Sequence, residues 1–171
     1  MADMLLVVDA QNDFIDGALG SEYALSIVPN IARKIRRFDG TVVFTRDTHD
    51  RGYLDTQEGK MLPVTHCVAG SHGWAINAQI AGARPGMCID KRTFGMDKDQ
   101  IAQMAQQQPS SIHIVGYVTD ICVITNALAL KTALPQTPIY VDAACCAGTS
   151  KAAHDAALTV MKSCQVVVEG A

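Results

Sequence analysis

The chain of 171 residues is long enough to bury the core of one domain, and we expect a single domain over residues 1–171. Its net charge of −3 at pH 7, with 18% charged residues, is too evenly spread to indicate nucleic acid or an anionic membrane as a partner. No apolar run approaches ~18 residues, so we expect no membrane span.

The six cysteines are spaced neither as a disulfide framework nor as a CxxC motif. The first residues lack the basic stretch and the long apolar stretch of a secretory leader, so we expect no signal peptide. Both observations predict reduced thiols and a cytoplasmic protein.

The first half of the chain predicts two strands, two helices and a long loop. Apolar residues predict a strand at 4–8, and apolar residues at helical spacing predict a helix at 26–37. A second strand is predicted at 41–45, and a short helix at 75–81. Residues 46–73 between them are polar and without periodicity, and such long loops in compact domains are usually functional.

The next part of the chain predicts a strand at 87–90, a helix at 97–107 and a buried strand at 111–115. Residues 116–123 follow as a strand-to-helix turn, with a glycine where the backbone bends. The helix predicted at 120–133 is apolar on nearly every side, so we expect it to be deeply buried or to cover a subunit interface.

A strand at 137–141, a helix at 150–162 and a last strand at 165–168 complete the predicted elements. Strands and helices therefore alternate along the whole chain. This alternation predicts an α/β fold, a doubly wound, six-stranded, mainly parallel sheet with helices on both faces.

Three reactive residues follow predicted strands, at the edge of the sheet where ligands bind in this class of fold. They are Asp9, Lys91 and Cys122. Cys122 falls in the first turn of a helix, where free N–H groups and the helix dipole favour a thiolate. Each residue also has an ordinary interpretation: Asp9 could cap a turn, Lys91 could be a surface charge, and Cys122 could be a core residue.

The long loop carries a possible metal site. In extended backbone the side chains of Asp47 and His49 point the same way, and Glu58 and His66 follow in the same loop. Two histidines with carboxylates suit Zn, Fe, Mn or Mg. Because these residue types are common in loops, the spacing alone favours an ordinary polar loop over a metal site.

Four segments resemble, in the same order, motifs of the isochorismatase-like cysteine hydrolases and, within them, of the nicotinamidases. Residues 8–14 resemble the D-x-Q-x-D-F opening, and residues 63–71 resemble the P-x-H-C-x-x-G-T segment. Residues 90–94 resemble the lysine segment, although the family more often has Ser-Ala-Phe a few residues on. Residues 116–123 resemble the nucleophile turn. The resemblance implies an isochorismatase-like fold without an organic cofactor.

The resemblance also implies a catalytic triad. Asp9 would take the proton of Cys122, and Lys91 would stabilise the negative charge of both. Backbone N–H groups of Val118 and Cys122 would form the oxyanion hole, and the peptide bond between Tyr117 and Val118 would be cis.

Two further sets of residues follow from the same resemblance. The metal ligands would be Asp47, His49, Glu58 and His66, and they would hold one divalent ion that binds a ring nitrogen of the substrate. The substrate contacts would be Phe14, Leu62 and Tyr117. Leu62 departs from the family, because several nicotinamidases have a tryptophan in this region.

The function implied is hydrolysis of a small carboxamide through a thioester, with nicotinamide converted to nicotinate in NAD salvage. We expect a small-molecule amide as the partner, and a homo-oligomer is compatible with the apolar helix. One alternative is a metal-independent amidohydrolase of carbamoyl or ureido substrates. Another is a non-catalytic, flavodoxin-like module that binds a small ligand. Isochorismatase itself is disfavoured, because cleavage of its vinyl ether does not use a nucleophilic cysteine.

Overall fold

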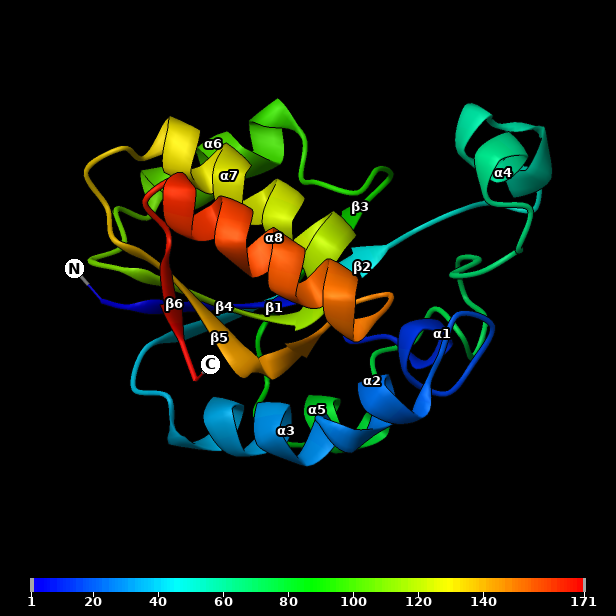
Figure 1. Cartoon of the computed structure of the whole chain (residues 1–171), viewed down its shortest axis with the longest axis horizontal. Coiled ribbons are helices and arrows are strands. Elements are labelled where there is room, and N and C mark those ends of the chain that lie inside the picture. Colours follow the sequence, from blue (N-terminus) through cyan, green and yellow to red (C-terminus); the bar gives the residue numbers. More distant parts are fainter. Residues whose placement is uncertain (1, 171) are drawn as a thin grey trace.

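A six-stranded parallel sheet forms the centre of the computed structural model, which describes residues 2–170 (Figure 1). The strand order is β3-β2-β1-β4-β5-β6, and every neighbouring pair is parallel. The strands are β1 (Met4–Val8), β2 (Thr41–Asp47), β3 (Met87–Lys91), β4 (Ile112–Tyr117), β5 (Ile139–Ala147) and β6 (Val167–Glu169). The prediction of a doubly wound α/β fold is confirmed.

Helices cover both faces of the sheet (Figure 1). One face carries α6 (Lys98–Gln106), α7 (Ile124–Ala133) and α8 (Lys151–Ser163). The other carries α2 (Glu22–Ser26), α3 (Val28–Arg37) and α5 (Ala78–Ala81). Two short helices, α1 (Asn12–Ile15) and α4 (Gln57–Met61), lie beyond the carboxyl ends of the central strands. Within residues 2–170, no helix combines the length and the apolar character needed to cross a bilayer.

The central strand β1 divides its side chains between two hydrophobic cores. Met4, Leu6 and Val8 pack on the side of α6–α8, while Leu5 and Val7 pack on the side of α2 and α3. All five are buried, as expected for a parallel strand covered on both faces.

Several boundaries differ from the sequence prediction. The helix predicted at 26–37 is α3, which begins two residues later with a proline in its first turn, and the short helix α2 before it was not predicted. The strand predicted at 137–141 starts later and continues to Ala147. The prediction ended too early because residues 142–147 lack the β-branched pattern from which strands are predicted. The long loop contains the 3₁₀ turn Tyr53–Asp55 and α4.

The topology places one crevice at the centre of the sheet. From β1 the chain first builds β2 and β3 on one side and then crosses to β4, β5 and β6 on the other. The carboxyl ends of β1 and β4 flank this switch point, where open α/β sheets bind ligands. Val8 pairs with Gly116 across it, and Asp47 pairs with Lys91 at the neighbouring strand ends.

Gly116 is required by this close pairing. Its φ is +123°, and a Cβ atom at this position would lie 2.0 Å from the backbone oxygen of Val8. We expect Gly116→Ala to lower the free energy of unfolding by at least ~2 kcal/mol, measured by urea denaturation. The matched control is Gly52→Ala, at a loop position with φ of −87°, which should change stability by less than ~0.5 kcal/mol. Equal stabilities for the two variants would contradict this assignment.

Candidate active site

Asp9 and Lys91 form a buried ion pair at the centre of the crevice. Asp9 follows β1 with φ of 45°, a left-handed conformation that turns the chain away from the strand. Its Oδ1 accepts a hydrogen bond of 2.7 Å from the Thr45 hydroxyl, and its Oδ2 lies 2.6 Å from Lys91 Nζ. Both charged side chains are fully buried, so each depends on the other for compensation.

Cys122 completes this group. It lies in the π-helical turn Thr119–Val123, between β4 and α7, and is 2% exposed. Its Sγ is 3.8 Å from Lys91 Nζ. The structure therefore brings together Asp9, Lys91 and Cys122, the three residues expected from the strand ends. The peptide bond between Tyr117 and Val118 is cis, as the sequence resemblance implies.

The electrostatics favour a protonated thiol at rest. Burial raises the pKa of Cys122, and the Asp9 carboxylate raises it further, while the Lys91 ammonium opposes them. Burial also raises the pKa of Asp9 against the lowering effect of Lys91. The pKa of Lys91 is lowered by burial, but the charges of Asp9, Cys122 and Asp47 outweigh burial and leave it raised. Burial and the Asp9 carboxylate therefore act against the thiolate that the helix terminus and the Lys91 ammonium favour.

Four further residues converge beside this group. The ligand-type atoms of Asp47, His49, Glu58 and His66 all lie within 4.8 Å of one another. Asp47 Oδ2 is 3.0 Å from His49 Nε2 and 3.5 Å from His66 Nε2. Glu58 Oε1 is 3.7 Å from His49 Nε2.

Backbone contacts orient two of these residues. The ring of His66 bonds through Nδ1 to the carbonyl of Val64 at 2.7 Å, which leaves Nε2 directed at Asp47. Gln11 holds the backbone of Asp47 at both ends: its Oε1 accepts from the Asp47 N–H at 2.7 Å, and its Nε2 donates to the Asp47 carbonyl at 2.8 Å. Such outer contacts are typical of metal sites.

The donor set fits a divalent cation. Two imidazoles and two carboxylates are ligands that Zn, Fe and Mn accept, and the carboxylates also suit Mg. Asp47 Oδ1 is buried without a hydrogen bond, an unsatisfied acceptor that a cation would satisfy. Although burial acts to raise it, hydrogen bonds from His49 and His66 hold the pKa of Asp47 below its usual range.

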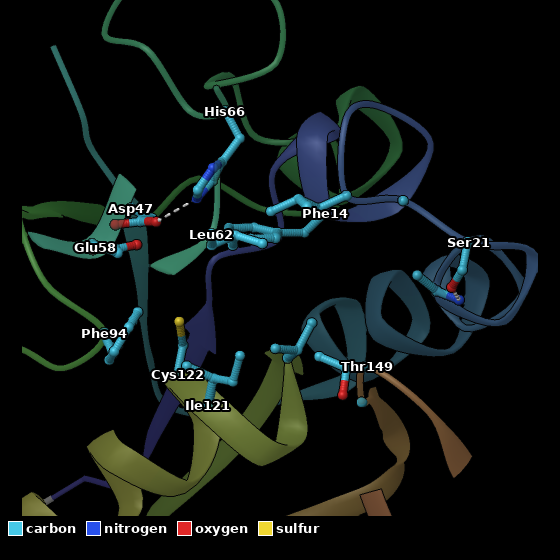
Figure 2. Close-up of a pocket in the computed structure, with 15 residues that line it drawn as sticks. Phe14, Ser21, Asp47, Glu58, Leu62, His66, Phe94, Ile121, Cys122 and Thr149 are labelled. Carbon is cyan, nitrogen blue, oxygen red and sulfur yellow. Dashed lines mark hydrogen bonds and ion pairs between the residues drawn. The ribbon is translucent and has the colours of Figure 1, made fainter. Parts of the chain in front are cut away.

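A cavity of about 310 Å³ lies between Cys122 and the ligand-type residues Asp47, Glu58 and His66. Figure 2 shows Cys122 pointing into it, with Asp47, Glu58 and His66 on one side and Ser21 and Thr149 toward the other. Its volume is at the lower end for small-molecule sites, which favours a small ligand. The lining residues are Phe14, Leu19, Gly20, Ser21, Ala24, Asp47, Glu58, Leu62, His66, Phe94, Val118, Ile121, Cys122, Gly148 and Thr149.

Two of the three residues expected to contact substrate line this cavity. Phe14 packs edge-on against His66, with ring centroids 5.6 Å apart, and Leu62 lies beside them. Tyr117 is placed elsewhere: its ring is fully buried in the core shared with α2 and α3, and its hydroxyl donates to the Ala24 carbonyl. The side chain of Tyr117 lies on the face of β4 covered by α2 and α3, and Tyr117 is not among the residues that line the cavity.

Several residues of the site were given no role by the sequence. Thr45 binds Asp9, Phe94 lines the cavity from the loop after β3, and Thr149 lines it from the loop after β5. Gln11 lies within the first motif, but the motif alone gave it no role. Tertiary packing brings these residues to the site, and a pattern within one segment of the sequence does not predict such contacts.

Comparisons with known proteins agree with this architecture. A family model described as the isochorismatase domain matches residues 3–171. A search of curated protein sequences found no match.

Solved structures match over nearly the whole chain. A nicotinamidase/pyrazinamidase from Bacillus subtilis has a TM-score of 0.87 at 24% identity, covering 99% of this chain and 100% of that one. A pyrazinamidase from Pyrococcus horikoshii in complex with zinc has a TM-score of 0.81 at 23% identity, covering 98% of both chains. A Leishmania protein (L. infantum) in complex with nicotinate has a TM-score of 0.81 at 19% identity, covering 98% of this chain and 91% of that one. At these identities the matches establish the fold.

Proposed function

The chain belongs to the isochorismatase family, and we propose that within it this protein is a metal-dependent cysteine amidohydrolase that converts nicotinamide to nicotinate and ammonia. One observation carries the proposal: Cys122 lines the same small cavity as Asp47, Glu58 and His66, and the fourth ligand-type residue, His49, contacts two of them. The names of the structural relatives, which include nicotinamidases and a zinc complex, support the same substrate and metal.

In the first half of the proposed reaction, Cys122 Sγ attacks the carboxamide carbon while Asp9 takes the thiol proton. The raised pKa of Cys122 makes this base necessary, because little thiolate exists before attack. Lys91, 3.8 Å from the sulfur, stabilises the negative charge as it develops. The backbone N–H groups of Val118 and Cys122 hold the oxyanion, typically worth ~2.7–4 kcal/mol for each donor.

The first half ends when the C–N bond breaks to leave the thioester, and Asp9 returns the proton to the leaving nitrogen, which departs as ammonia. The second half is hydrolysis of this thioester. Asp9 then takes a proton from water as the water attacks the thioester carbon. Breaking the C–S bond releases the acid and restores the Cys122 thiol with that proton. The atoms balance as one amide and one water giving one acid and one ammonia.

The four ligand-type residues would bind substrate rather than perform hydrolysis. Asp47, His49, Glu58 and His66 would hold a divalent ion, which supplies a Lewis-acidic position for the pyridine nitrogen. Phe14 and Leu62 provide apolar contacts for the flat ring, and the cavity walls limit the water around it.

Ammonia release from a small panel of amides tests the proposal. The panel contains nicotinamide, pyrazinamide, benzamide and a ureido compound, assayed with zinc present. We expect release from the two ring-nitrogen amides. Release from the ureido compound alone would replace the proposal with the carbamoyl or ureido hydrolase.

Asp9→Asn is expected to lower kcat for nicotinamide at least ~100-fold, because general base catalysis contributes 10²–10⁴-fold and Asp9 acts in both half-reactions. The control is Asp13→Asn. Asp13 lies in the same motif but accepts hydrogen bonds from the N–H groups of Cys67 and Ala18, a structural role that an amide oxygen retains in part. A loss of less than about tenfold in Asp9→Asn would remove Asp9 from the role of base.

A further inference from the structure

Asn126 joins two parts of the site that are distant in sequence. It lies on α7, one turn after the nucleophile turn, and its side chain is fully buried. Its Nδ2 donates to the carbonyl of Cys122 at 2.8 Å and to the carbonyl of Phe94 at 3.3 Å. Its Oδ1 accepts from the N–H of Met96 at 2.9 Å. One amide therefore connects the residue that carries the sulfur to the loop after β3.

That loop also holds the charged end of Lys91. The Lys91 ammonium donates to the carbonyl of Thr93 at 3.0 Å, and the Thr93 hydroxyl donates to the carbonyl of Gly95 at 2.8 Å. Phe94, between them, lines the cavity beside Cys122 (Figure 2). The position of the Lys91 ammonium therefore depends on this loop. Both ends of the Asn126 amide, Oδ1 and Nδ2, tie the loop to α7 by hydrogen bonds.

We propose that Asn126 is a positioning residue that fixes the distance between the Lys91 ammonium and the Cys122 sulfur. This inference rests on the proposed function, in which Lys91 stabilises the thiolate. The attraction of two charges falls as their separation grows. At an effective dielectric constant of ~20, lengthening the 3.8 Å contact by ~1 Å weakens it enough to reduce the thiolate population about fivefold.

Two variants separate this role from simple support of the helix. Asn126→Ala removes all three hydrogen bonds. Asn126→Thr keeps a donor for the Cys122 carbonyl, because threonines on this helix donate to carbonyls four residues earlier, as Thr125 and Thr132 do. The threonine side chain at position 126 is too short to reach the loop. The control is Thr132→Val, which removes one such bond from an exposed site on α7.

The measurement is the rate of Cys122 alkylation by iodoacetamide, located by peptide mass mapping because Cys88 and Cys164 are exposed. Zinc affinity and circular dichroism well below the melting temperature show that each variant is folded. We expect both Asn126 variants to react at least about fivefold more slowly than the wild type, and Thr132→Val to react at the wild-type rate. The value of kcat for nicotinamide should fall in parallel.

Wild-type or faster alkylation in folded Asn126→Thr would overturn the inference, since Asn126 would then only satisfy the helix carbonyl. Because alkylation needs no substrate, a wild type that hydrolyses none of the amides would refute the proposed function and still leave this test decisive. If Asn126→Ala does not fold, Asn126→Thr against Thr132→Val decides alone.

Discussion

Replacing Cys122 by alanine is expected to abolish amide hydrolysis, lowering kcat at least ~10⁴-fold, as removal of a covalent nucleophile does in other hydrolases. The thioester cannot form without the sulfur, and none of the other residues lining the cavity has a thiol. Ammonia release under saturating nicotinamide measures the loss. Calorimetric titration with nicotinate should show retained binding, because the ring contacts lie on the opposite wall.

Cys146→Ala is the matched control for that result. Cys146 is as buried as Cys122, but it belongs to β5, packs in the core on the side of α7 and α8, and does not line the cavity. Its replacement should lower stability by a fraction of the ~2–5 kcal/mol lost in larger core truncations and leave kcat within about twofold. An active Cys122→Ala enzyme would exclude the covalent mechanism through this residue.

The strands were predictable because each signal is local. β1 consists of five consecutive apolar residues, a pattern typical of a central parallel strand that is buried on both faces. All five are buried in the structure. The prediction for β5 ended too early because its second half has no such local signal. Its second half, residues 142–147, pairs with β4 after a register shift between Ile114 and Gly116, which a pattern of apolar residues does not encode.

The site residues that lie at strand ends were predictable from the sequence. The site residues that meet only through tertiary packing were not. Asp9 and Lys91 each follow a strand, so the order of the strands brings them together. Asn126 has an ordinary polar position in a helix, and only the packing of α7 against the loop after β3 gives it Phe94 and Met96 as partners in addition to the Cys122 carbonyl one turn earlier. The motif around Tyr117 does not give the direction of its side chain, which packs with that of Val115 on the side of α2 and α3.

The protonation of Cys122 shows how burial changes a local argument. The helix terminus alone favours a thiolate. Desolvation of a sulfur that is 2% exposed and lies next to the Asp9 carboxylate acts in the opposite direction and raises the pKa of Cys122. The sequence identifies the helix terminus, but not the degree of burial, and the degree of burial determines the direction of the shift.

Removing the metal is expected to abolish nicotinamide hydrolysis while leaving the nucleophile reactive. Nicotinamide offers a ring nitrogen, whereas benzamide has the same shape and the same amide without it. A site built for a polar partner rejects an analogue that lacks the partner by factors that can reach ~10⁴. We therefore expect chelation, or His49→Ala, to lower nicotinamide turnover toward the low rate of benzamide, and to change the benzamide rate little.

The alkylation rate of Cys122 separates loss of substrate binding from loss of the nucleophile. His49 contacts Asp47 and Glu58, and its Nε2 makes no contact with Asp9 or Cys122, so alkylation should continue in His49→Ala within about threefold of the wild-type rate. His72→Ala, at an exposed loop position, is the histidine control and should retain full turnover. Undiminished nicotinamide hydrolysis after chelation would mean that the four residues do not bind substrate through a metal. The carbamoyl or ureido hydrolase would then be the better interpretation, because its reaction needs the Asp9, Lys91 and Cys122 group alone.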